Sequence, residues 1–141
     1  MGCHNSIVIN APVDKVWNAI KDFHDFSWSA NVITYLKIVG DASGNEIGAK
    51  RVLNDAFHET LISVDEKARK FTYSIDEGPG PLAPGNVKGY VGAVKLHPVT
   101  ADNSTFVLWT SHWDEDATGE IADFCNPIYQ ALLGDLKGHF E

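Results

Sequence analysis

The sequence predicts an α+β fold in which a curved, seven-stranded antiparallel sheet wraps around a long C-terminal helix, with two short helices after the first strand. Three observations predict it. Apolar residues follow the helical period near the N-terminus, alternate with a period of two from residue 32 onward, and return to the helical period over residues 118–140. The connections between the alternating segments are short and polar, which favours antiparallel hairpins.

The composition is that of an ordinary globular protein, and we expect one domain spanning residues 1–141. Hydrophobic residues make up 44% and charged residues 21% of the chain, and no apolar run approaches the roughly 18 residues of a membrane span. The formal net charge of −8 comes without a cluster of Lys and Arg. We therefore expect no nucleic-acid partner and no stable membrane insertion, and the chain could be a monomer or a homodimer.

The N-terminal residues contain a short acylation pattern. Met1-Gly2-Cys3, followed by Ser6, matches the M-G-x-x-x-[ST] signature for N-myristoylation. A strand is predicted from about residue 6 and no basic cluster follows, so a chance match is the preferred interpretation and acylation stays open. The second cysteine, Cys125, lies near the opposite end, so we expect no structural disulfide and a cytoplasmic protein.

The first part of the chain predicts one strand and two short helices. Residues 6–10 are an apolar run bounded by polar residues, as in a first strand. Pro12 suits the first turn of a helix, whose apolar stripe has spacings of three and four and consists of Val13, Val16, Trp17, Ile20 and Phe23. Residues 24–31 predict a second short helix or an irregular turn.

The rest of the chain predicts the remaining strands and the long helix. Six strands are expected at residues 34–39, 49–54, 57–64, 70–76, 87–98 and 105–114. Residues 118–140 predict a helix with an apolar stripe of Ile121, Phe124, Cys125, Ile128, Leu132 and Leu136. Pro127 should kink this helix without ending it, because the stripe continues in phase.

The predicted inner face of the sheet contains polar and aromatic side chains where a packed core would be dry. Phe57, Glu59, Leu61 and Ser63 share one side of their strand, because side chains repeat every two residues. Such a face suits a lined cavity between sheet and helix. The expected ligand-binding residues are Phe57, Glu59, Leu61, Tyr73, Ile75, Tyr90, Trp109, Ser111, Trp113, Phe124 and Ile128. Core filling is the alternative for any single aromatic residue among them.

Four segments, in this order, resemble a known superfamily. They are Ala11-Pro12-Val13-Asp14-Lys15-Val16-Trp17 with Phe23, then Glu59-Thr60-Leu61-Ile62-Ser63-Val64-Asp65, then Tyr73-Ser74-Ile75, and finally Tyr90 with the alternating strand after it. Together they resemble the START-like (SRPBCC) superfamily, also called helix-grip and birch-pollen-allergen-like. The polyketide cyclase/dehydrase-like branch is the most similar. The gate and latch sequences of the plant hormone receptors in this superfamily are not kept.

The resemblance implies a helix-grip fold and a cavity under the last helix for a small hydrophobic molecule, with an aromatic or polyketide-like molecule as one option. It also implies two loops at the mouth of the cavity. By position, these loops contain Asn54, Asp55 and Ala56, and then Pro79, Pro81, Leu82 and Pro84. The second loop is equally compatible with a long turn.

Glu59 is the candidate catalytic residue. A carboxylate facing an apolar cavity loses hydration, which raises its pKa and suits it to proton transfer. A structural role, with Glu59 bonded to backbone or to a tyrosine, is the equal alternative. The chain is therefore predicted either to bind a ligand or to act as a cyclase, dehydrase or isomerase in which Tyr73, Tyr90 and Trp109 hold the substrate. A module that docks a partner through its mouth loops is a third alternative.

No cofactor or metal is expected. The six histidines show no ligand spacing, and both His58 and His112 fall on the outward side of their strands. Cys125 occupies an apolar helix position and is expected to be an inert buried thiol. The expected partner is a small hydrophobic ligand.

Overall fold

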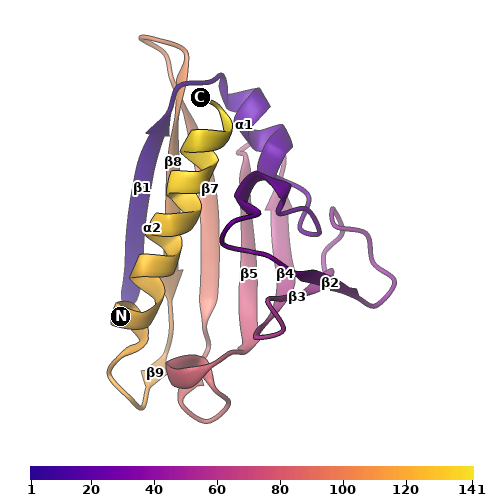
Figure 1. Cartoon of the computed structure of the whole chain (residues 1–141), viewed down its shortest axis with the longest axis vertical. Helices are drawn as coiled ribbons and strands as arrows, with labels where there is room; N and C mark the ends of the chain where they lie inside the picture. The colour runs from indigo at the N-terminus through magenta and orange to yellow at the C-terminus, as the bar shows by residue number, and fades with distance from the viewer.

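The computed structural model describes all residues, Met1–Glu141. Its main feature is a seven-stranded antiparallel sheet with the strand order β1-β8-β7-β5-β4-β3-β2. These strands are β1 (Gly2–Ile9), β2 (Leu36–Val39), β3 (Lys50–Leu53), β4 (Phe57–Asp65), β5 (Lys70–Glu77), β7 (Val91–Val99) and β8 (Ser104–His112). A separate pair, β6 (Val87–Lys88) with β9 (Glu115–Asp116), extends below the sheet in Figure 1.

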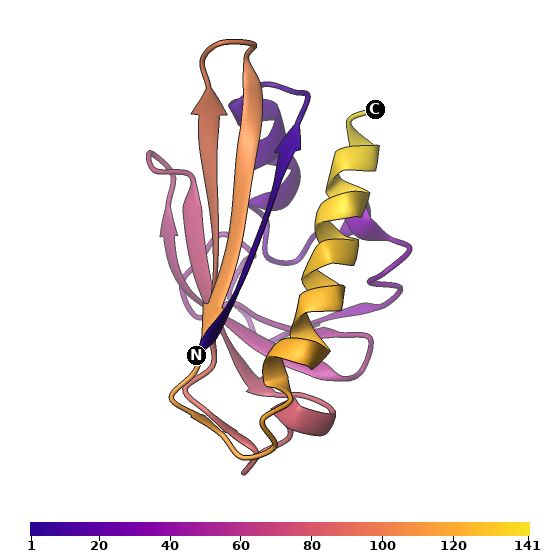
Figure 2. The ribbon, with the colours of Figure 1, turned by 90° about the vertical axis from the view of Figure 1, so that its left-hand side faces the viewer.

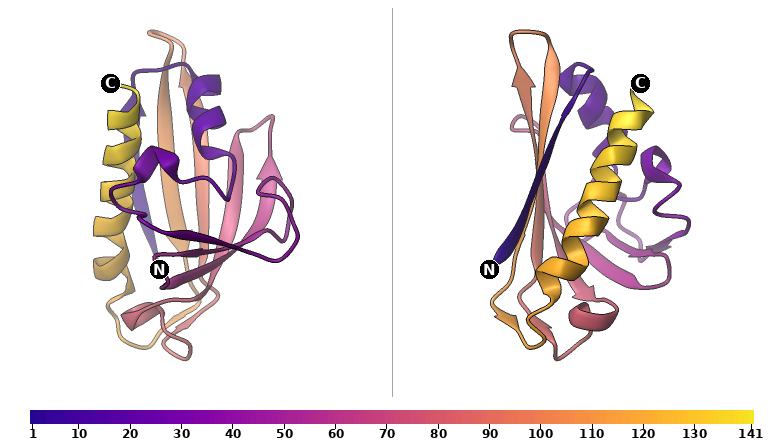
Figure 3. Two further views of the ribbon diagram at one scale, coloured as in Figure 1. Left: turned by 45° about the vertical axis from the view of Figure 1, so that its right-hand side comes forward. Right: turned by 60° about the vertical axis from the view of Figure 1, so that its left-hand side comes forward.

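The helices lie on one face of the sheet. They are α1 (Val13–Ile20), the 3₁₀ turns η1 (Ser27–Ser29) and η2 (Gly80–Leu82), and the long helix α2 (Ile121–His139). In Figure 2, α2 runs past the long strands with the sheet on one side of it, and Figure 3 shows α1 and the η1 segment on that same side. The sheet curves around these elements. The predicted helix-grip architecture is confirmed.

One hydrophobic cluster of 28 buried residues fills the space between sheet and helices. In α1 the buried residues are Val16, Trp17 and Ile20, as the spacing of three and four predicts. In α2 the buried stripe continues on both sides of Pro127, so the proline does not end the helix. The segment 24–31 is mostly irregular, with a single 3₁₀ turn at η1.

The first strand begins earlier than predicted. β1 pairs with β8 from Gly2 opposite His112 to Ile9 opposite Thr105. A Cβ atom on Gly2 would lie 2.3 Å from the carbonyl oxygen of Ser111, so this close approach requires glycine. The glycine of the acylation pattern therefore has a packing role in the sheet.

The predicted strand at residues 87–98 is wrong as a single element. It is broken at Gly89, whose φ of +70° favours glycine, and the Asp114 side chain lies where a Cβ would be. The residues before the break pair with β9, and those after it pair with β5 and β8. The predicted strand at residues 105–114 ends at His112, and Glu115–Asp116 form β9 instead.

A register shift in β4 corrects one prediction about the inner face. Leu61 pairs with Tyr73, but Ser63 pairs with Thr72, so one residue of β4 is left unpaired between them. Beyond this bulge the alternation changes phase. Ser63 is exposed, and Val64 packs against the core instead.

Candidate functional site

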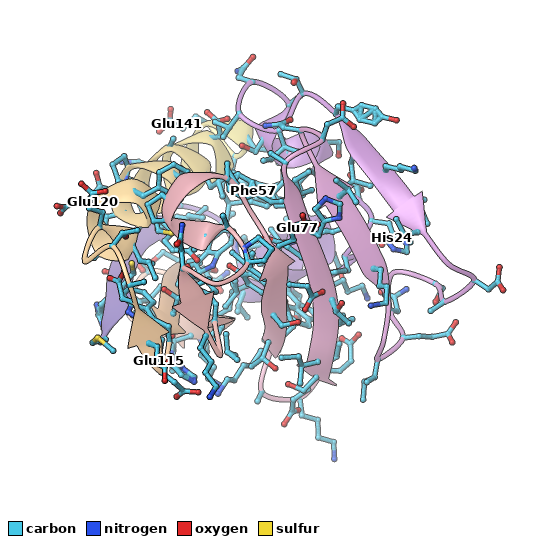
Figure 4. All side chains as sticks on the ribbon, turned by 90° about the horizontal axis from the view of Figure 1, so that it is seen from below. His24, Phe57, Glu77, Glu115, Glu120 and Glu141 are labelled. Atoms are coloured by element: carbon cyan, nitrogen blue, oxygen red, sulfur yellow. The ribbon has the colours of Figure 1, made fainter.

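A cavity lies between the sheet and α2. Of its 14 lining residues, 12 are apolar or aromatic, and the other two are Arg51 and Glu59. The cavity offers about 40 Å³ to the centre of a water molecule, which is room for roughly three waters. Figure 4, seen from below, shows Phe57 near the middle of the molecule, with Glu115 and Glu120 at the periphery. The site is therefore a narrow, mostly apolar space with one pair of opposite charges.

Seven of the residues predicted from the sequence lie in this wall: Phe57, Glu59, Tyr73, Ile75, Leu82, Trp109 and Ile128. The other seven were not predicted: Phe26, Ile33, Arg51, Leu53, Cys125, Tyr129 and Leu132. Five of the second set come from β3 and α2, and Phe26 and Ile33 flank η1; how these elements meet depends on tertiary packing. The role of either set in binding a ligand stays a prediction.

Five predicted residues lie outside the wall. Tyr90 stacks on Trp113 with ring centroids 5.7 Å apart, and Ser111 is buried opposite Cys3. None of Tyr90, Ser111 and Trp113 lines a cavity, and α2 packs against β1 at this side of the interior. The remaining two pack in other directions: Leu61 is in the core, and Phe124 packs on the ring of Phe57 at 6.3 Å.

The first predicted mouth loop connects β3 to β4 and does not line the cavity. Asn54 and Asp55 both have left-handed backbones, with φ of 55° and 54°. The Asn54 side chain accepts hydrogen bonds from the backbone N–H groups of Thr34 and Tyr35, at 2.9 and 3.2 Å, and donates to the Val32 carbonyl at 2.9 Å. This loop, including Ala56, therefore anchors the segment before β2.

The second predicted mouth loop contributes one side chain to the cavity wall. Leu82 is buried and lies in the cavity wall, whereas Pro79, Pro81 and Pro84 do not. The backbone N–H of Gly78 donates to the Leu82 carbonyl at 3.0 Å, and a Cβ on Gly78 would lie 2.7 Å from that of Leu82. The loop thus folds back tightly on itself and holds Leu82 in the cavity wall.

Glu59 forms a buried ion pair with Arg51. The two residues are directly opposite on β4 and β3, and their side chains are only 6% and 4% exposed. Arg51 Nε and Nη2 lie 2.8 and 2.6 Å from Glu59 Oε1. Burial raises the pKa of Glu59, and the charge and hydrogen bonds of Arg51 oppose that rise. Both contacts are made by Oε1, and Oε2 makes no hydrogen bond within the protein.

Arg51 is held by aromatic rings as well as by Glu59. Its guanidinium carbon lies 3.7 Å from the ring centroid of Phe23 and 4.7 Å from that of Phe26, and Nη1 donates to the Phe23 carbonyl at 3.0 Å. The position of Arg51 opposite Glu59 could have been predicted from the sequence. If Leu53 and Phe57 flank the turn at residues 54–56, hairpin pairing places Arg51 opposite Glu59.

A cluster of hydrogen-bonded tyrosines lies beside the ion pair. Trp109 Nε1 donates to Tyr73 Oη at 2.8 Å, Tyr73 Oη lies 3.3 Å from Tyr129 Oη, and Tyr129 Oη also bonds Tyr90 Oη. Burial raises the pKa of all three tyrosines, so the hydroxyls stay protonated at neutral pH. Tyr129 follows Cys125 by four residues and precedes Leu132 by three, a helical spacing that could have identified it.

Some other polar groups in the interior make no hydrogen bond. Trp28 Nε1, Ser111 Oγ and Trp113 Nε1 are buried without a hydrogen-bond partner. Burial raises the pKa of Cys125 to about 11, so its thiol is protonated at neutral pH. No group of three or more His, Cys, Asp or Glu side chains comes together in a way that could hold a metal ion.

A curved antiparallel sheet that grips a long C-terminal helix over an apolar cavity defines a helix-grip protein of the START-like superfamily. Within it, the chain belongs to the family described as "Polyketide cyclase / dehydrase and lipid transport", which it matches over residues 3–141. A search of curated proteins finds no match.

Solved structures share this fold over nearly the whole chain. A protein from Nitrosospira multiformis is 44% identical, with a TM-score of 0.96 and coverage of 100% of this chain and 97% of that one. A protein from Thermobifida fusca is 21% identical, with a TM-score of 0.82 and coverage of 99% and 92%. The protein XoxI from Bacillus cereus is 22% identical, with a TM-score of 0.79 and coverage of 99% and 94%. The chain has no helix that combines the length and apolarity required to cross a membrane.

Proposed function

We propose that the protein binds a small, mostly apolar molecule in the cavity between the sheet and α2. The observation that supports it best is the composition of the wall. Twelve of its 14 residues are apolar or aromatic, and the few polar groups converge from β3, β4, β5 and α2. Ligand sites typically combine such an apolar lining with a small number of placed polar groups. The description of the family supports the same class of function.

Binding requires the cavity to expand. About 40 Å³ for water centres holds a few water molecules and not a two-ring organic molecule. Leu82 is the side chain best placed to move, because it lines the cavity from the β5–β6 connection while the rest of the wall belongs largely to the sheet and α2. We propose that ligand entry displaces the η2 turn and withdraws Leu82 from the wall.

Two variants test this site with a defined probe. The probe is the two-ring hydrocarbon tetralin or its ketone 1-tetralone, titrated into ¹⁵N-labelled protein and followed by NMR. Ile128→Trp fills the cavity and should weaken binding at least tenfold, whereas Leu82→Ala enlarges the opening and should speed association. Ile62→Ala is the control, because Ile62 is 42% exposed on the outer face. Absence of binding by both probes, or equal binding by Ile128→Trp and the wild type, would contradict the proposal.

Native mass spectrometry of protein purified under mild conditions would detect a ligand that co-purifies with the protein and give its mass. A retained molecule should be displaced by 1-tetralone if both occupy this cavity. A ligand that remains bound in the presence of saturating 1-tetralone, and in the Ile128→Trp variant, would place the natural binding site elsewhere.

A second candidate function is proton transfer by Glu59. A buried carboxylate lies in the wall with one oxygen unpartnered, and burial raises its pKa against the opposing effect of Arg51, which makes it a stronger base. The elementary step is abstraction of a proton from the carbon next to a ketone, giving an enolate that takes a proton back from solvent. For 1-tetralone in D₂O this step replaces the C2 hydrogens by deuterium.

The exchange experiment distinguishes ligand binding alone from catalysis by Glu59. If Glu59 acts as a base, the wild-type protein accelerates loss of the C2 proton signals of 1-tetralone, and Glu59→Gln binds the ketone without accelerating exchange. Equal exchange rates in buffer, wild type and Glu59→Gln would remove the enzymatic candidate for this ketone and leave binding as the function of the site.

A further inference from the structure

The two edges of the sheet differ in how they are protected. At one edge, β2 has only four residues and carries Lys37, and a short, charged edge strand discourages pairing with another chain. At the other edge, β1 has eight residues, with no lysine, no proline and no register shift against β8. Its only partner is β8, so alternate residues present N–H and C=O groups on the open side. In Figure 2 this edge faces the viewer, with α2 beside it.

The surface around β1 is formed by segments without charged side chains. The 11 Lys and Arg and the 19 Asp and Glu residues of the chain are all absent from residues 1–13, 104–113 and 124–134. These segments lie together, because β1 pairs with β8 along its whole length and α2 packs against β1. The row of paired residues through Ser6 first reaches a charge at Lys95, two strands from the edge. Such depletion of charge is typical of the centre of an interface.

The side chains on this surface are complementary to a copy of themselves. Ser6 and Val8 lie on the outer side of β1, and Val8 is 51% exposed. On the other side, Asn5 Nδ2 donates to Asn126 Oδ1 at 2.9 Å. Gln130, one helical turn further along α2, is exposed. Hydroxyl and amide groups both donate and accept, so identical groups can pair across a two-fold axis.

We propose that the protein forms a symmetric dimer in which β1 pairs antiparallel with β1 of a second copy. The two-fold axis passes near the middle of the strand, and the two sheets become one continuous sheet whose central backbone groups are paired. A second copy fits this edge because each molecule has a net charge of −8, and contact through the uncharged surface brings the fewest like charges together. The inference does not depend on the proposed function, since no residue of β1 lines the cavity.

Analytical ultracentrifugation of the full chain, at concentrations up to about 1 mM, tests the dimer. The wild type should change from monomer to dimer as its concentration rises. Ser6→Lys brings two like charges together at the middle of the paired strands, and it should raise the dissociation constant at least about tenfold. Ile38→Lys is the matched control, because Ile38 is 56% exposed on the opposite edge strand and its replacement should leave the dimer unchanged.

Two measurements on the wild type locate the contact without a substitution. Raising the protein concentration should slow amide hydrogen exchange at alternate residues of Gly2–Ile9, where the N–H groups lie on the open side, and not in β2. Added NaCl should lower the dissociation constant, since it screens the repulsion between two molecules of charge −8 and this interface has no ion pair to weaken.

Several results would overturn the inference. A wild type that stays monomeric at about 1 mM has no such dimer. A dimer that Ser6→Lys leaves intact, that protects no amide of β1, or that weakens with added salt has its interface elsewhere. Circular dichroism shows whether Ser6→Lys is folded, and if it is not, amide exchange in the wild type decides the question.

Discussion

Removing Arg51 should destabilise the protein far more than removing an arginine from its surface. Arg51→Met replaces the guanidinium by an apolar chain of similar length and leaves Glu59 buried without its partner. Breaking one half of a buried ion pair typically costs about 3–5 kcal/mol. Loss of the guanidinium contacts with Phe23 and Phe26 adds to this by about 0.5–2 kcal/mol. Against a typical total stability of about 5–15 kcal/mol, the variant should be close to its folding limit at neutral pH.

The loss of stability in Arg51→Met should increase as the pH rises. Burial raises the pKa of Glu59 and Arg51 opposes this, so the pKa rises further in Arg51→Met. The folded variant then holds its proton more tightly than the unfolded chain does. The variant is therefore closest to wild-type stability below about pH 4.3, and it loses stability as the pH rises, by at most about 1.4 kcal/mol per unit.

The assay is urea unfolding at pH 5, 6 and 7, with the midpoint and slope compared between variants. The double variant Arg51→Met/Glu59→Leu removes both charges and should recover most of the loss, because an apolar pair of similar volume replaces the ion pair without an unpaired charge. Arg69→Met is the matched control: its pair with Asp14 is also 2.8 Å long, but the side chains are 28% and 75% exposed. Arg69→Met should lower the free energy of unfolding by less than about 1 kcal/mol.

The reasoning would be refuted by either of two results. One is a loss below about 1 kcal/mol for Arg51→Met at pH 7, comparable with Arg69→Met. The other is a loss that does not change between pH 5 and pH 7, which would show that the charge on Glu59 does not determine the deficit.

Three further substitutions test the packing around the site. In Gly92→Ala, the new Cβ would lie 2.3 Å from Tyr73 Cζ, so we expect a loss of about 1–3 kcal/mol in urea unfolding and altered fluorescence of neighbouring Trp109; an unchanged spectrum would contradict this contact. Gly134→Ala adds a methyl in open space on α2 and should stabilise by about 0.5–1 kcal/mol, shown by a higher melting temperature. Asn54→Ala removes the hydrogen bonds to the segment before β2 and should cost about 1–3 kcal/mol, with faster amide exchange at Thr34 as the direct check.

Local periodicity was sufficient to predict most of the fold. The alternation of Phe57, Glu59 and Leu61 and the helical stripe through Ile121 and Leu136 each depend on residues close in sequence. The predictions were wrong where a single residue broke the period. The left-handed Gly89 split one expected strand, and the bulge in β4 moved Ser63 to the outside.

The candidate site was predictable only in part, because its wall comes from elements far apart in the chain. Glu59 faces the interior as the period of two predicts, but its partner Arg51 had to be found by pairing across a hairpin. Tyr129 joins Tyr73 and Tyr90 over sequence separations of 56 and 39 residues. No local pattern reports a contact of that kind.

The sequence by itself determined the order and type of most elements, the buried face of most strands, and the presence of a carboxylate on that face. These properties follow from side-chain direction, which repeats every two residues in a strand and every 3.6 in a helix. Only the tertiary structure decided that Glu59 is paired, that Leu82 lies in the cavity wall, and that Tyr90 and Trp113 stack on each other outside it. Those outcomes depend on where α2 and η2 lie across the sheet, which is fixed by packing between distant segments.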